Sequence, residues 1–102
     1  MEIYNKLVRD KIPEIMKNKG EKAVTRILPH ESYLSELDKK LNEEVREYQE
    51  SKDIEELADI IEVIYSISEV KGCSVDELHK IRELKKQQRG GFKDRIFLIS
   101  KE

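Results

Sequence analysis

A chain of 102 residues fits one domain, so we predict a single domain over residues 1–102. Charged residues make up 41% of the chain, but the formal net charge is only −2, which argues against a nucleic-acid partner. No apolar run is long enough to span a bilayer, the first residues lack the apolar stretch of a signal peptide, and Cys73 stands alone. We therefore expect a cytoplasmic protein with no membrane partner and no intrachain disulfide.

The first predicted elements are a short helix and a long one. The short helix begins at Pro13 and runs to about Asn18, with Gly20 just beyond its end. From His30 to about Glu50, apolar residues recur every three or four positions, which predicts a long helix with one apolar stripe. That stripe consists of Leu34, Leu37, Leu41, Val45 and Tyr48.

Two further helices follow in close succession. One is expected from Asp53 to about Lys71, and the next begins after Ser74 and ends near Arg89. Asp53 and Ser74 are both typical N-cap residues, and each is followed three positions later by a glutamate, as in a capping box. The helix from Asp53 is apolar over more than half of its circumference, so we expect a dimer or a larger assembly that covers it on several sides.

Two short apolar runs predict strands. They lie at residues 23–28 and 92–99, and we expect them to pair as a small β-hairpin-like appendage near the termini. Helices dominate the remainder of the chain. The predicted fold class is therefore all-α, an antiparallel helical bundle with that appendage.

Acidic residues occupy unexpected positions on the third predicted helix. Because helical residues advance by about 100° per position, Glu56 and Asp59 fall on its apolar face. Glu44 and Glu47 border the apolar stripe of the preceding helix, and the short connection predicts antiparallel packing that brings the two pairs together. Carboxylates that converge repel one another unless a cation lies between them, and hard oxygen ligands suit Mg²⁺ or Mn²⁺.

A plainer interpretation competes with a metal site. Glutamate-rich helices are common and usually mark a solvated face, so Glu56 would serve only the capping box, while Glu43 and Glu50 are expected to face water. Asp59 favours the metal site, because no capping role explains an acid in the second turn of an apolar arc.

Three segments of the chain resemble a known family. Residues 43–47 (EEVRE) and 56–59 (ELAD) are similar to the EExxE…ExxD signature of the MazG-like, all-α nucleotide pyrophosphohydrolases. Residues 5–13 and 89–92 resemble the phosphoribosyl-ATP pyrophosphohydrolase-like branch, and the likeness extends over nearly the whole chain. One departure is that Glu47 and Glu56 are closer in sequence than is commonest in the family.

The resemblance implies a function and a ligand set. It implies one MazG-like domain that assembles as a homodimer or homotetramer and binds Mg²⁺, or Mn²⁺ in its place. The domain would cleave a nucleoside triphosphate between the α- and β-phosphates to release pyrophosphate. Removal of non-canonical nucleotides would be a suitable cellular role. The family's metal ligands match Glu44, Glu47, Glu56 and Asp59. Glu44 or Glu47 would also act in catalysis by accepting a proton from the attacking water.

The outer segments supply candidate substrate contacts under the same resemblance. Their basic residues suit phosphate or ribose, the aromatic residue suits base stacking, and the remaining polar residues suit hydrogen bonds. Considered alone, the same residues would be surface charges, turn caps and an apolar anchor. The candidates are Asn5, Lys6, Arg9, Asp10, Arg89, Phe92 and Arg95.

A non-catalytic helical module is the alternative function. It would be either a nucleotide sensor that binds without hydrolysis or an oligomerisation unit. A sensor could dispense with one metal ligand, and an oligomerisation helix needs no acids on its apolar face. The chain keeps all four acids, which favours catalysis.

Overall fold

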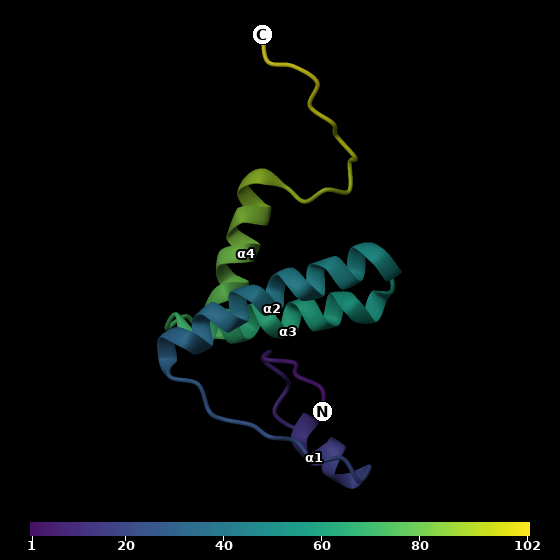
Figure 1. Cartoon of the computed structure of the whole chain (residues 1–102). Coiled ribbons are helices and arrows are strands. Elements are labelled where there is room, and N and C mark those ends of the chain that lie inside the picture. Colours follow the sequence, from purple (N-terminus) through teal and green to yellow (C-terminus); the bar gives the residue numbers. More distant parts are fainter.

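The computed structural model describes all residues, 1–102, as an all-α protein of four helices (Figure 1). The helices are α1 (Ile12–Asn18), α2 (His30–Ser51), α3 (Ile54–Val70) and α4 (Val75–Arg89). This confirms the predicted class, and each helix begins and ends close to its expected bounds. None of the four helices combines the length and the apolar character that crossing a membrane requires.

Helices α2 and α3 form an antiparallel pair that positions the candidate site (Figure 1). The chain reverses at Lys52, which adopts a left-handed conformation with φ of 62° and donates its backbone N–H to the Tyr48 carbonyl. The only buried apolar residues of the protein belong to this pair. They are Leu37 of α2, with 2% of its surface exposed, and Val63 of α3, with 7%.

Helix α4 leaves the far end of α3 at an angle, contacts only that helix and extends away from the pair (Figure 1). Its predicted N-cap is confirmed, because the Ser74 hydroxyl accepts a hydrogen bond of 3.1 Å from the Glu77 backbone N–H. The equivalent side-chain cap of α3 does not form. Asp53 lies at the N-cap position, but its side chain caps nothing and its N–H donates to the Ser51 hydroxyl.

The predicted β-hairpin-like appendage is absent, and residues 23–28 and 92–99 form no strand. The first segment runs between α1 and α2, whereas the second belongs to the C-terminal arm (residues 90–102), which leaves α4 on the other side of the molecule (Figure 1). A strand requires a neighbour to pair with its backbone N–H and C=O groups, and neither segment has one. The apolar pattern alone therefore misled the prediction.

The N-terminal segment (residues 1–11) returns to the α2–α3 pair. It passes along that pair while α1 itself lies apart from the other three helices (Figure 1). Two ion pairs join the segment to the helices, one from Lys6 to Glu43 and one from Arg9 to Asp59. The N-terminal segment therefore brings two basic side chains to the acidic residues of the helix pair.

Candidate metal centre

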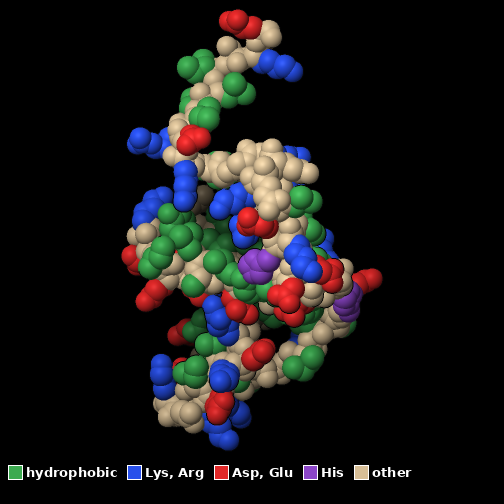
Figure 2. All heavy atoms as spheres, turned by 180° about the vertical axis from the view of Figure 1, so that it is seen from behind, with side chains coloured by type: hydrophobic (Ala, Val, Ile, Leu, Met, Phe, Trp, Pro, Cys, Tyr) green, Lys and Arg blue, Asp and Glu red, His purple; other side chains and the backbone are tan.

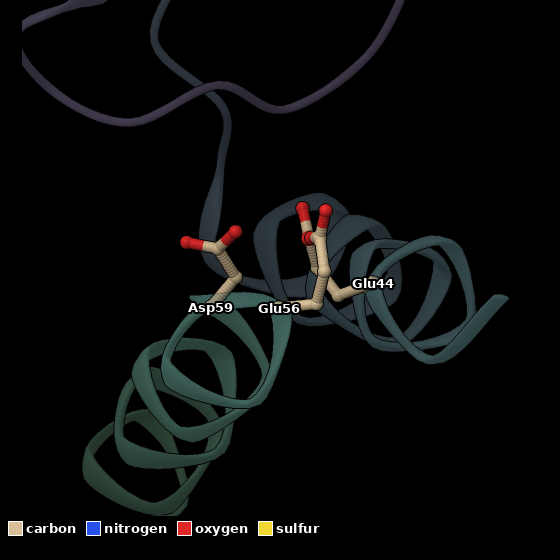
Figure 3. A group of neighbouring side chains, drawn as sticks. All are labelled: Glu44, Glu56 and Asp59. Atoms are coloured by element: carbon tan, nitrogen blue, oxygen red, sulfur yellow. The ribbon is translucent and has the colours of Figure 1, made fainter. Parts of the chain in front are cut away.

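Three acidic side chains from two helices converge on one point. Glu44 comes from α2, and Glu56 and Asp59 come from α3; each offers a carboxylate oxygen, and these oxygens lie within 4.8 Å of one another. The three carboxylates project to the same side of the helix pair (Figure 3). We call these three residues the carboxylate cluster. Its geometry is suitable for holding a metal ion.

Local sequence explains why these three side chains meet. Glu56 and Asp59 are three residues apart in α3, which places them one turn apart on the same face. The tight turn at Lys52 sends α3 back along α2, so Glu44 lies beside them. The competing capping role of Glu56 is not realised at the start of α3, since the Asp53 N–H bonds to a serine hydroxyl.

Glu44 is the most informative member of the cluster. Only 6% of its surface is exposed, although it carries a carboxylate. Its Oε1 atom lies 3.4 Å from the Lys40 ammonium, whereas its Oε2 atom is buried without any hydrogen-bond partner. Buried carboxylate oxygens are normally satisfied, because leaving one unpaired costs free energy. A cation held by the cluster would supply the missing partner.

The electrostatics of the cluster also favour a bound cation. Burial raises the pKa of Glu44, and the charge of Glu47 raises it further against the attraction of Lys40. Burial likewise raises the pKa of Glu56, with additional repulsion from Glu47, Asp59 and Glu44. Both shifts show that ionised carboxylates are unfavourable here, and a divalent cation would relieve that repulsion.

The fourth predicted ligand, Glu47, lies next to the cluster rather than within it. Its side chain is exposed, and the converging oxygens belong to the other three acids. It is close enough for its charge to raise the pKa values of Glu44 and Glu56. Glu47 is therefore placed to be a further ligand or a base at the edge of the site.

Cations of the N-terminal segment already contact this region. The Arg9 guanidinium lies 2.7 Å from Asp59 Oδ1, and the Lys6 ammonium lies 3.3 Å from Glu43 Oε1. Two of the predicted substrate-binding residues, Lys6 and Arg9, are thus at the acidic region. In this structure both cations compensate carboxylate charge.

Glu43, which was expected to face water, is instead held by two lysines. Lys40 Nζ lies 3.3 Å from its Oε2 atom, and Lys6 bonds its other oxygen. Burial works to raise the pKa of Glu43, but the hydrogen bonds and charges of Lys40 and Lys6 outweigh burial and lower it. Glu43 thus remains ionised and anchors the N-terminal segment beside the carboxylate cluster.

A cavity of about 370 Å³ lies between the N-terminal segment and the helix pair. Its wall includes two cluster carboxylates, Glu44 and Asp59, and also the predicted substrate residues Arg9 and Asp10. Asn5 does not line it. The volume falls within the roughly 300–1,000 Å³ of small-molecule pockets. Its apolar lining consists of Leu7, Val8, Tyr33, Leu37 and Val63.

The remaining predicted substrate residues lie elsewhere. Arg89 is the last residue of α4, and Phe92 and Arg95 belong to the C-terminal arm. Phe92 is 97% exposed, and the arm extends from the side of the molecule opposite the N-terminal segment (Figure 1). Within one chain, the structure does not bring these three residues to the carboxylate cluster.

Sequence reasoning missed three residues of the site. Lys40 pairs with Glu43 and Glu44, and its spacing of three and four residues from them on one helix was a usable signal. Tyr33 and Ser66 line the cavity, but they do so only because the N-terminal segment folds over the helix pair. No local pattern predicts that long-range placement.

Comparison with protein-family models, with curated proteins and with solved structures gives no match for this chain. The structure itself shows an all-α, four-helix protein with an acidic cluster that could hold a metal ion. Function must therefore be inferred from the chemistry of that cluster and its surroundings.

Proposed function

We propose that this protein is a Mg²⁺-dependent nucleoside triphosphate pyrophosphohydrolase, of the MazG-like kind that its acidic signature resembles. The reaction would cleave between the α- and β-phosphates and release pyrophosphate. One observation carries the proposal: the buried, unpartnered Oε2 atom of Glu44 lies in a cluster of three carboxylates. A merely solvated acidic face would leave that oxygen in water.

The residues of the cluster fit magnesium. Glu44, Glu56 and Asp59 offer hard oxygen donors from two rigid helices, and Glu47 lies beside them as a further donor. Mg²⁺ binds few protein ligands, retains several waters and usually bridges to substrate phosphates. When bound, such an ion would neutralise phosphate oxygens and lower the pKa of a coordinated water. Mn²⁺ accepts the same donors.

The chain's own residues would supply the other requirements of the reaction. The side chains of Lys6 and Arg9 are 45% and 54% exposed, so they would exchange their carboxylate partners for phosphate oxygens, and Arg suits phosphate especially well. Glu47 is exposed beside the cluster and would accept the proton of the attacking water. The cavity along Tyr33 would hold the nucleoside part of the substrate.

The first prediction tests the site directly. Asp59→Asn should lower hydrolysis by on the order of a hundredfold or more, because changes even outside the ligand shell of a metal cost about 10–100-fold. Hydrolysis would be measured over canonical and non-canonical triphosphates with Mg²⁺, and chromatography would identify a nucleoside monophosphate and pyrophosphate. Circular dichroism should show unchanged helical content.

The matched control for this test is Glu55→Gln. It also removes one charge from the first turns of α3, but Glu55 is exposed and lies outside the carboxylate cluster. It should retain full activity. Full activity of folded Asp59→Asn would refute the metal site, and release of inorganic phosphate would refute the cleavage position. Nucleotide binding by the parent without turnover would instead favour the sensor alternative.

A further inference from the structure

The C-terminal arm carries a row of large apolar side chains that are almost fully exposed. Phe92, Ile96, Phe97, Leu98 and Ile99 are between 79% and 97% exposed. The arm extends away from the helices, with its hydrophobic side chains standing clear of the body (Figures 1 and 2). Its one backbone hydrogen bond beyond the helix end joins Arg95 to Phe92 within the arm. Covering these side chains would be favourable, because apolar surface exposed to water costs free energy.

A second apolar surface lies on the outer face of α3. Ile54, Ile61 and Ile64 are 76%, 46% and 37% exposed, and their spacing of seven and three residues places them in one stripe. This stripe is separate from the face that carries Glu56 and Asp59. On α4, the exposed residues Ile81 and Leu84 add to the uncovered apolar surface.

The single chain is more open than a compact monomer of its size. Its accessible surface is 9568 Å², whereas a compact monomer of 12.1 kDa exposes about 6,000 Å². Its radius of gyration is 17.9 Å, against about 13 Å for a compact chain of this length. The single chain therefore exposes about 3,500 Å² more than a compact monomer would. An obligate interface buries about 2,000–5,000 Å² in total, of which each partner contributes about half. The excess surface is thus large enough for such an interface.

We infer that the C-terminal arm of each chain docks on a second copy of the chain, against the α3 stripe, to form an arm-exchanged dimer. A second copy fits best because each chain presents both halves of the contact, an apolar arm and an apolar helical stripe, as a symmetric interface requires. The arm also points away from its own α3 (Figure 1). This inference goes beyond the proposed function and does not depend on it.

The direct test is a photo-reactive phenylalanine analogue in place of Phe97, in the full chain. Irradiation should yield a cross-linked species at twice the single-chain mass of 12.1 kDa, with the attachment mapping to α3. Mixing isotopically light and heavy chains should give linked light–heavy peptides. A cross-link within one chain, or none at all, would overturn the inference. Because the cross-link forms in the assembled protein, this test does not depend on whether the separated single chain folds.

A substitution gives the second test. Phe97→Asp should weaken the dimer by at least about tenfold in dissociation constant, because a charge would enter a desolvated contact. Ser100→Asp is the matched control, since it adds the same charge to the arm outside the apolar run, and it should dimerise like the parent. Sedimentation would measure both. A monomeric parent at micromolar concentration, or equal dimerisation of Phe97→Asp and the parent, would contradict the inference.

Discussion

Glu44 brings a negative charge into the least exposed part of the helix pair, and only one of its oxygens has a partner. Lys40 contacts Oε1, while Oε2 is buried and unpaired. The protein therefore tolerates an unfavourable state at this residue when no cation is bound. Such states are commonly found at functional sites, where a ligand removes the cost.

Magnesium should therefore stabilise the folded protein, and one ligand variant should respond less. Glu56→Gln relieves repulsion in the metal-free protein, so it should melt no lower than the parent in a chelator. With magnesium at about 100 times its dissociation constant, the parent should gain about 2.7 kcal/mol, and the variant clearly less. Thermal melts over a magnesium titration, repeated with a non-hydrolysable triphosphate analogue, would measure both effects. Equal melts in every condition would indicate plain surface charges.

The raised pKa values of Glu44 and Glu56 also predict a pH dependence. An acid whose pKa is higher in the folded state than its ordinary value of 4.5 contributes stability that is complete below that value. This contribution is lost as the pH rises through the raised pKa. Glu43, with a lowered pKa, acts in the opposite sense, and its contribution is lost as the pH falls.

In a chelator, the melting temperature should accordingly fall as the pH rises from about 4.5 towards neutrality. Glu56→Gln should show a smaller fall in melting temperature, because it removes one of the two carboxyl groups whose pKa is raised. Added magnesium should reduce the fall in the parent. A parent whose metal-free melting temperature rises steadily over this range would show that repulsion within the cluster is unimportant.

At the level of elements, the two helix starts that look alike in sequence differ in structure. Ser74 caps α4 through its hydroxyl, whereas the Asp53 side chain makes no cap bond to α3. Ser74→Ala should therefore cost about 1 kcal/mol of stability, and Asp53→Ala should cost less. Urea unfolding of the two variants would measure the difference, with Ser74→Asp as a control that keeps a capping oxygen. An equal cost for both alanine variants would contradict the structural distinction.

The helices and much of the carboxylate cluster could be predicted because their signals are local. The helical period places Glu56 and Asp59 on one face, and a short turn brings Glu44 back beside them. The apolar runs at residues 23–28 and 92–99 misled the strand prediction, because strand pairing depends on a neighbour that is distant in sequence. For the same reason, nothing local predicted that Arg9 would contact Asp59, which lies 50 positions further along the sequence.

At the scale of the whole molecule, the open shape means that stability and association are linked. Only Leu37 and Val63 are buried apolar residues, which is a very small core for a chain of this length. A second copy that covers the α3 stripe and the arm would enlarge that core. Melting temperatures measured at different protein concentrations would then differ, and they must be compared at a fixed concentration.

The N-terminal segment is attached to the body largely through charge, which makes its attachment sensitive to ionic strength. Its pairs, Lys6–Glu43 and Arg9–Asp59, are partly exposed, and screening shortens from about 10 Å at 0.1 M salt to about 3 Å at 1 M. Hydrogen–deuterium exchange of the amides in residues 2–11 should therefore accelerate in 1 M NaCl relative to 0.1 M, while α2 exchanges as before.

Arg9→Gln should exchange rapidly at both salt concentrations, since its main ionic tether is gone. If packing of Leu7 and Val8 in the cavity held the segment instead, salt would have no effect on its exchange. Where the tether is ionic, a divalent cation bound at Asp59 would compete with Arg9 for the same carboxylate. The first ten residues would then behave as a built-in counter-ion, released when the metal takes its place.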